Sequence, residues 1–283
     1  MHLTILYRGP LESCNYGCAY CPFAKRRQTA AELAQDRHAL VRFARRIETL
    51  HQHEFSILFT PWGEALIHPY YQEILTHLSY LPHVRKVAIQ TNLSCELDWI
   101  KSAHPERLAL WTTFHPEWSD LNLFLGKCTR LDQLGIRYSV GVVGFPDFKT
   151  AIATLRQRLD PGVYLWINAV KAELPHLDPQ DRAFFQSIDP LYEINTHHYP
   201  SLGKACRTGK SVFSVDGEGT IRRCHFIHEP IGNFYDANFE QVLQERLCIN
   251  PTCHCHIGYV HLEYLDMDKI FGSGLLERIP QNF

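Results

Sequence analysis

The chain has 283 residues, with a hydrophobic fraction of 45%, a charged fraction of 20% and a formal net charge of −2 at pH 7. Such a length fits one large domain, or a main domain with a smaller appendage, and it can bury a sizeable core without disulfides or metals. The near-neutral charge gives no bulk argument for binding nucleic acid or a membrane surface.

Localisation is expected to be cytoplasmic. No run of the sequence approaches the ~20 apolar residues of a membrane span. The first ten residues lack the basic segment of a signal peptide and are too short to be one. In a cytoplasmic setting, the ten cysteines favour ligation of metals by thiolates over disulfide bonds.

The first predicted strand, residues 3–8, leads into the segment CNYGCAYC, which contains Cys14, Cys18 and Cys21. Structural zinc sites usually have four protein ligands. Three thiolates can instead hold three irons of a [4Fe–4S] cluster and leave the fourth iron open. We therefore favour an iron–sulfur cluster here, and a zinc site that borrows a distant histidine is the alternative.

Strand-like and helical runs alternate through the first two thirds of the chain. A helix is predicted over residues 29–50, because Leu33, Leu40, Phe43 and Ile47 recur at helical spacing. With the first strand and helix, the pattern makes about six βα units, which predicts a parallel sheet with helices outside. Further strands are expected at 55–60, 86–91, 107–113, 137–143 and 163–168, and further helices at 70–79, 97–102, 121–134, 148–158 and 179–187.

A cysteine loop between a first strand and a first helix resembles the radical SAM superfamily. The motif there is CX3CXφC with an aromatic residue at φ, and Tyr20 fills that place. The resemblance implies an α/β fold with a partial (βα)6 TIM-like barrel, whose site lies at the C-terminal strand ends. It also implies that the open iron binds S-adenosylmethionine (SAM) and that a 5′-deoxyadenosyl radical abstracts hydrogen from a substrate. The chain is also similar to a small bacterial family known only as radical SAM proteins, through FTPWGEAL, SVDGEGTIRRCHFI and CHCHIGYVHL, and this likeness brings no substrate.

The resemblance assigns a turn after the second strand to the SAM site. TPWGEAL resembles the Gly-Gly-Glu motif that holds the SAM amino group. Trp62 replaces the first glycine, so only Gly63 and Glu64 carry over, and backbone contacts at Trp62 are in doubt. The alternative is an ordinary turn followed by a solvated glutamate.

Further positions near the expected site also follow predicted strands. Thr91 and Asn92 match a TNG-type turn and are expected beside SAM, although Leu93 replaces the glycine. His115 follows the fourth strand and is expected to contact the SAM ribose or the substrate, while a structural hydrogen bond explains it equally well. Other polar candidates are Glu117, Asn168 and Lys171, together with Arg26 and Arg27 of the basic segment 24–27, which either pair with the SAM carboxylate or belong to a solvated loop.

A second group of cysteines lies in the last third of the chain. Cys206 and Cys224 flank a predicted hairpin, in the pattern C-x12-G-x4-C with Gly219 as the glycine. Cys248, Cys253 and Cys255 follow a helix predicted near residues 239–247. Taken alone, this set suits a four-cysteine zinc ribbon about as well as an iron–sulfur cluster.

The hairpin resembles the twitch or SPASM extension of radical SAM enzymes, where a CX9–15GX4C hairpin supplies ligands for an auxiliary [4Fe–4S] cluster. The resemblance implies a barrel over residues 1–190 and a small cysteine-rich α+β extension over residues 191–283. Its implied ligands are Cys206, Cys224, Cys253 and Cys255. Cys248 is held in reserve, and His254 or His256 could replace one cysteine, because the C-x-C pair departs from the usual C-x2-C.

The favoured function is an oxygen-sensitive radical SAM enzyme with one auxiliary cluster, acting on a peptide or a small metabolite. An auxiliary cluster either accepts the substrate's electron or binds the substrate, and four cysteine ligands favour the first role. A flavodoxin- or ferredoxin-type reductant is expected. One alternative is an iron–sulfur protein for electron transfer or redox sensing without SAM chemistry. Another is a zinc-binding interaction module that uses the C-terminal cysteines with His254, His256 and His261.

Overall fold

A computed structural model describes residues 1–23 and 26–283, so the first two residues of the basic segment 24–27 lie outside the described residues. Six parallel strands stand side by side in chain order and form most of a mixed sheet. All six were predicted, to within two residues at either end. They are β1 (His2–Arg8), β2 (Glu54–Phe59), β3 (Val84–Thr91), β4 (Leu108–Thr113), β5 (Arg137–Val143) and β6 (Leu165–Asn168).

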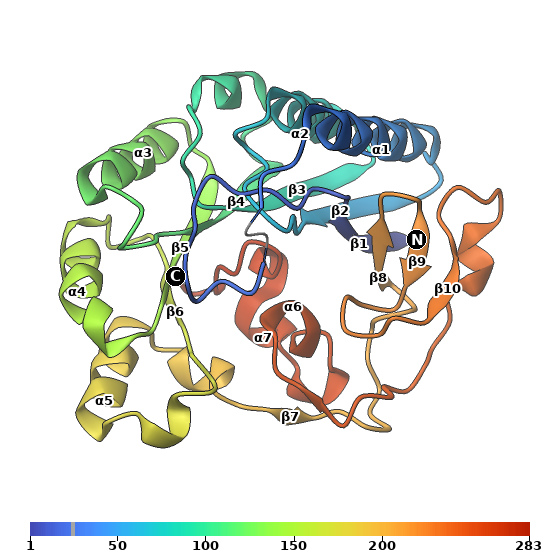
Figure 1. The fold of residues 1–283 in the computed structure, drawn as a ribbon. Helices are drawn as coiled ribbons and strands as arrows, with labels where there is room; N and C mark the ends of the chain where they lie inside the picture. Colours follow the sequence, from blue (N-terminus) through green and yellow to red (C-terminus); the bar gives the residue numbers. More distant parts are fainter. Residues whose placement is uncertain (24–25) are drawn as a thin grey trace.

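Helices connect these strands and cover the outer face of the curved sheet (Figure 1). The first begins at Thr29, where a capping box with Glu32 satisfies two backbone donors. The helix predicted over 97–102 is instead a 3-10 turn, in which Ile100 N donates to Leu97 O. The helices are α1 (Ala30–Thr49), α2 (Pro69–Tyr80), α3 (Leu121–Gln133), α4 (Lys149–Arg158) and α5 (Pro179–Ile188).

The predicted hairpin of the last third extends the same sheet. Strand β8 (Val212–Asp216) pairs in parallel with β1, and β9 (Thr220–Arg222) pairs antiparallel with β8. With β10 (Pro230–Asn233) the order becomes β10-β9-β8-β1-β2-β3-β4-β5-β6. The hairpin turn has Gly219 at φ +82°, a conformation that favours glycine.

The helix predicted near residues 239–247 is largely absent. A 3-10 turn at Phe239–Val242 takes its place, and the chain then runs irregularly to Cys248. The backbone there pairs with another segment, because Cys248 N donates to Lys204 O and Gly203 N donates to Cys248 O. These bonds carry Cys248 back toward the segment that contains Cys206.

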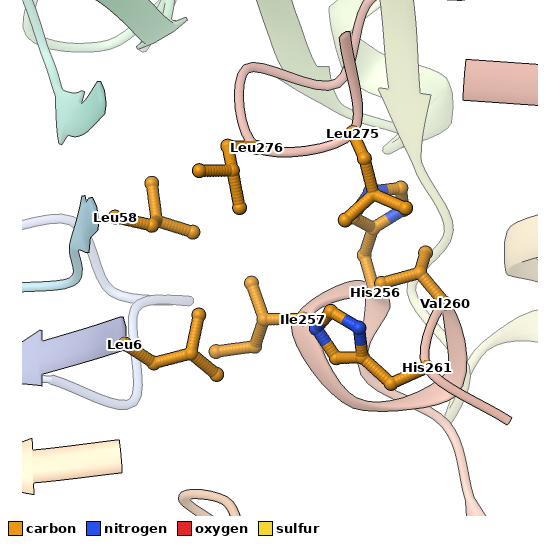
Figure 2. Close-up of a pocket in the computed structure, with 8 residues that line it drawn as sticks. All are labelled: Leu6, Leu58, His256, Ile257, Val260, His261, Leu275 and Leu276. Atoms are coloured by element: carbon orange, nitrogen blue, oxygen red, sulfur yellow. The ribbon is translucent and has the colours of Figure 1, made fainter. Parts of the chain in front are cut away.

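The C-terminal segment enters the space that the curved sheet encloses. Short helices α6 (His256–Tyr259) and α7 (Asp268–Phe271) lie inside the crescent of strands in Figure 1. Figure 2 shows Leu6 and Leu58, from β1 and β2, facing Ile257 and Leu276. These side chains pack so closely that no room remains for a water molecule, so this part of the interior is a core and not a pore.

A buried carboxylate fixes the end of this segment to the sheet. Glu277 is fully buried, and its Oε1 pairs with Lys86 of β3 and lies 3.1 Å from Arg137 Nε at the start of β5. Its carbonyl oxygen accepts a bond of 2.6 Å from Ser139 Oγ. In the described residues, none of the helices has the length and apolar character needed to cross a bilayer.

Replacing Glu277 with glutamine should destabilise the fold, because the Lys86 ammonium, whose side chain is only 13% exposed, loses the buried carboxylate that pairs with it. Breaking a buried ion pair from one side costs about 3–5 kcal/mol, whereas an exposed pair contributes about 1 kcal/mol or less. The matched control is Glu54→Gln, which breaks the exposed pair of Glu54 with Arg85. Urea unfolding measures both losses, and equal losses in the two variants would contradict this account of the anchor.

Candidate cofactor site at the strand ends

The cysteine loop, residues 9–29, joins the end of β1 to the start of α1. Cys18 is buried in it, while Cys14 and Cys21 are half-buried. Burial raises the pKa of the Cys14 and Cys18 thiols, and the nearby thiols of the same loop raise it further. The three predicted cysteines thus share one loop, in surroundings where bare thiolates are costly.

Polar groups lie close to the sulfurs of Cys14 and Cys18. Tyr16 N donates to Cys14 Sγ at 3.4 Å, and Asn92 Nδ2 lies 4.0 Å from the same sulfur. His115 Nδ1 lies 3.4 Å from Cys18 Sγ. Hydrogen bonds to sulfur stabilise thiolates and tune the potential of an iron–sulfur centre.

His115 is held by the φ aromatic of the motif. Tyr20 Oη lies 2.9 Å from His115 Nδ1, and the two rings stack at 6.1 Å with 10° between their planes. Burial lowers the pKa of His115 to about 4, so the imidazole is neutral at pH 7. Tyr20 also packs against Phe145 and Phe148, which follow β5, and so connects the cysteine loop to the ends of β4 and β5.

The turn after β2 supports the cysteine loop directly. Glu64 N donates to Ser13 O at 3.0 Å. A Cβ added to Gly63 would lie 1.8 Å from Ser13 O, a distance that no other residue type tolerates. Trp62 is exposed, and its ring lies near Phe23 and beneath the Arg8 guanidinium, so the side chain that replaces the motif's first glycine points away from this contact.

Glu64 is buried, which excludes the alternative of a solvated glutamate. Its carboxylate accepts bonds from Thr91 Oγ1 at 2.8 Å, from Asn92 N at 2.5 Å and from Leu66 N at 3.0 Å. Burial raises its pKa to about 7 despite these three bonds. Leu93 has φ +57°, so the chain makes the left-handed turn expected of a glycine there.

The thiols of the second group affect one another's pKa values. Burial raises the pKa of Cys224 to about 11, and the thiols of Cys206 and Cys248 contribute. Burial raises the pKa of Cys253 to about 12, and the thiols of Cys224, Cys255, Cys248 and Cys206 contribute. Cys248, which the sequence pattern held in reserve, thus lies among the assigned cysteines, and the choice of four ligands stays a prediction.

The histidines of the zinc hypothesis point elsewhere. His256 and His261 are buried and line the apolar contact of Figure 2. His254 stacks on His198 at 5.0 Å. Throughout residues 1–23 and 26–283, no three His, Cys, Asp or Glu side chains, the cysteines of both groups included, are arranged closely enough to hold a single metal ion.

The remaining candidates have varied surroundings. Arg26 is exposed and forms ion pairs with Glu12 and Glu32. Its guanidinium, which the sequence analysis assigned to the SAM carboxylate, is therefore already paired with two carboxylates of the chain. Burial lowers the pKa of Lys171 to about 8, and its Nζ donates to Asn195 O. Arg27, Glu117 and Asn168 are exposed.

No protein-family model matches the chain, and no curated protein was found to match it. Solved structures match its fold. Native anSMEcpe with bound AdoMet aligns at a TM-score of 0.55 and 13% identity, over 86% of this chain and 81% of that chain. Native anSMEcpe with bound AdoMet and the Kp18Cys peptide aligns at 0.55 and 13%, over 85% and 80%. At this identity the likeness shows the fold alone, an α/β fold with a large, mostly parallel sheet, as the sequence pattern predicted.

Replacing Gly63 with alanine should displace the cysteine loop, because the new Cβ would overlap Ser13 O. We expect the reconstituted variant to hold fewer irons per chain than the wild type. The control is Gly126→Ala in α3, where a Cβ meets nothing within 4 Å and alanine favours the helix by about 1 kcal/mol. Iron analysis after anaerobic reconstitution tests this, and an unchanged iron content in Gly63→Ala would contradict the supporting role of the turn.

Proposed function

We propose that the chain is a radical SAM enzyme with its radical site at the C-terminal ends of the parallel strands. One observation carries the proposal: the loop that contains Cys14, Cys18 and Cys21 is held at Ser13 by the turn Gly63–Glu64, whose carboxylate also binds Thr91 and Asn92. The same fold occurs in anSMEcpe with bound AdoMet. We infer that this chain binds the same cofactor.

The donor set fits a [4Fe–4S] cluster. Cys14, Cys18 and Cys21 supply three soft sulfur ligands, as an open-iron cluster requires. When bound and reduced, such a cluster would supply the electron that cleaves SAM to a 5′-deoxyadenosyl radical able to abstract hydrogen from the substrate. The chain's own part is to hold the thiolates, with a hydrogen-bond donor at Tyr16 N beside Cys14 and the neutral His115 ring beside Cys18.

Around that centre, we assign Gly63, Glu64, Thr91, Asn92 and His115 to the SAM site. The Glu64 carboxylate already accepts three hydrogen bonds, so we infer that it positions the ends of β2 and β3. Tyr20 would position the His115 ring through its hydroxyl. The catalytic acid or base of the substrate reaction stays unassigned.

We further propose a twitch- or SPASM-type auxiliary [4Fe–4S] cluster in residues 191–283, attached to a barrel of residues 1–190. Cys206 and Cys224 would supply two ligands, and two of Cys248, Cys253 and Cys255 would complete the set. The thiols of Cys206, Cys224, Cys248 and Cys255 all raise the pKa of Cys253, which supports this proposal. An electron-acceptor role for this cluster would make the net reaction an oxidation.

The substrate is proposed to be a peptide or a small metabolite, and a flavodoxin or ferredoxin is the proposed reductant. A peptide is bound in one of the anSMEcpe structures, which makes a peptide substrate worth testing here.

The radical chemistry is tested on protein reconstituted without oxygen, reduced with dithionite and mixed with SAM. We expect 5′-deoxyadenosine, detected by mass spectrometry, from the wild type and none from the triple variant Cys14→Ala, Cys18→Ala, Cys21→Ala. The matched control is Cys95→Ala, Cys128→Ala, which removes two buried cysteines outside both groups and should leave the product unchanged.

Iron analysis of the triple variant tests the second cluster. About four irons per chain should remain if one cubane survives. A wild type that has a reducible cluster, but makes no 5′-deoxyadenosine even with cell extract added as a source of substrate, would favour the electron-transfer alternative.

A further inference from the structure

A pocket of about 220 Å³ opens at the end of the barrel opposite the cysteine loop. Arg137 lines it and is the first residue of β5, so the pocket lies where the parallel strands begin. Two stretches of the C-terminal segment, within residues 271–274 and 279–283, supply the other walls, and in Figure 1 the end of the chain lies beside β5. At ~30 Å³ for each water molecule, this volume corresponds to roughly seven waters, which is enough for a small ligand.

The walls of the pocket are bonded to each other. Ile279 N donates to Gly274 O at 2.8 Å across the two stretches. The Gln281 side chain covers Gly272, where an added Cβ would lie 2.4 Å from Gln281 Nε2. Gly272 has φ +47° and Arg278 has φ +56°, so both stretches turn through left-handed backbone, which is uncommon for a residue other than glycine. The pocket is therefore a built feature of the fold and not a gap between free loops.

The surface of the pocket carries an excess of positive charge. Arg137 Nε lies 3.1 Å from Glu277 Oε1, and Lys86 pairs with the same oxygen. Two cations thus share one carboxylate, which leaves one positive charge in excess. Glu277 is fully buried, and none of the described residues that line the pocket carries a carboxylate side chain. The pocket therefore presents the guanidinium to a ligand, and not the carboxylate.

Most of the Arg137 guanidinium is unused. Its side chain is 45% exposed, and in the described part of the chain its two Nη groups donate to no acceptor. A guanidinium has five N–H donors in a planar fork, and only the one on Nε contacts Glu277. The remaining donors match the paired oxygens of a carboxylate or a phosphate, which arginine binds in a bidentate manner.

A second polar group is available beside it. The Ser273 side chain lines the pocket and has no hydrogen-bond partner within residues 1–23 and 26–283. The exposed surface of the pocket is mainly polar, which suits a hydrophilic anion better than an apolar ligand. Size, charge and donors therefore agree on a small oxyanion.

We propose that this pocket, the Arg137 pocket, binds a small carboxylate or phosphate and thereby holds the C-terminal segment against the start of β5. The Nη groups of Arg137 bind two oxygens of the anion, and the Ser273 hydroxyl donates to it. This inference goes beyond the proposed function, because the pocket lies at the opposite end of the strands from Gly63 and Glu64. An anion that binds only the folded state also stabilises that state.

Calorimetric titration of the cluster-loaded protein with inorganic phosphate and with acetate tests the proposal. Both titrations are run at constant ionic strength, with chloride as the anion that is replaced, and without reductant or SAM. We expect at least one probe to bind saturably, with a Kd of about 10 mM or lower, as one charge-assisted bidentate contact would give. The tighter probe identifies the oxyanion. No saturable binding of either probe would overturn the proposal.

Substitutions of Arg137 test the guanidinium. Arg137→Gln should weaken binding at least tenfold, and Arg137→Lys several-fold, because lysine keeps the charge but loses the fork of donors. The matched control is Arg85→Gln, which removes an exposed cation that pairs with Glu54 near the start of β3. This control should leave the Kd unchanged. Equal binding by Arg137→Gln and the wild type would contradict the assignment.

A second variant leaves every charge in place, because Arg137→Gln also removes a bond to Glu277. Ser273→Phe should fill the pocket and weaken binding at least tenfold. Circular dichroism verifies that each variant is folded. A saturating concentration of the tighter probe should raise the urea midpoint of the wild type but not that of Ser273→Phe, and an equal rise in both proteins would overturn the proposal.

A final arm adds saturating SAM to the titration. The Kd of the probe should stay the same, because the cysteine loop and the Arg137 pocket lie at opposite ends of the strands. Displacement of the probe by SAM would place the bound anion near the cysteine loop and would overturn the assignment to this pocket.

Discussion

The hydrogen bonds of the buried Glu64 hold the candidate site together. Its carboxylate joins the ends of β2 and β3 through Thr91 Oγ1 and Asn92 N, and its backbone N–H holds the cysteine loop at Ser13 O. Asn92 in turn reaches Cys14 Sγ and the side chain of Asn15. A segment of 21 residues between β1 and α1 (residues 9–29) would otherwise have much conformational freedom. The hydrogen bonds of Glu64 and Asn92 therefore restrict where the three thiols lie.

The C-terminal segment fills the space inside the curved sheet. The row Leu6, Leu58, Ala88 and Ala109 runs across four adjacent strands and faces inward. Its two alanines leave room for the chain that follows Cys253, and Ile257 and Leu276 pack into that room. The same segment introduces Cys255 and Arg278, so one stretch of chain both fills the partial barrel and furnishes its polar groups.

Much of the fold follows from local patterns. The strands and helices of the first two thirds were predictable because each buried strand alternates with an amphipathic helix, and Thr29 with Glu32 signals the start of α1. The pairing of β8 with β1 was not predictable, because it joins residues about 200 positions apart. The helix expected over residues 239–247 stops after the 3-10 turn at Phe239–Val242, because Gln244 N donates to Gly209 O instead of to a carbonyl oxygen of the same helix. The cysteine spacing predicted both thiol groups, whereas the pairing of Glu277 with Lys86 and Arg137 depends on three elements that only the tertiary fold brings together.

The central claim is that the first three cysteines form a SAM-binding cluster distinct from a second one. Electron paramagnetic resonance of the dithionite-reduced protein, recorded with and without SAM, tests it most directly. We predict that SAM changes the spectrum of the wild type, and that the variant lacking Cys14, Cys18 and Cys21 keeps a cluster signal that SAM does not alter. A wild-type spectrum that is identical with and without SAM would contradict the account.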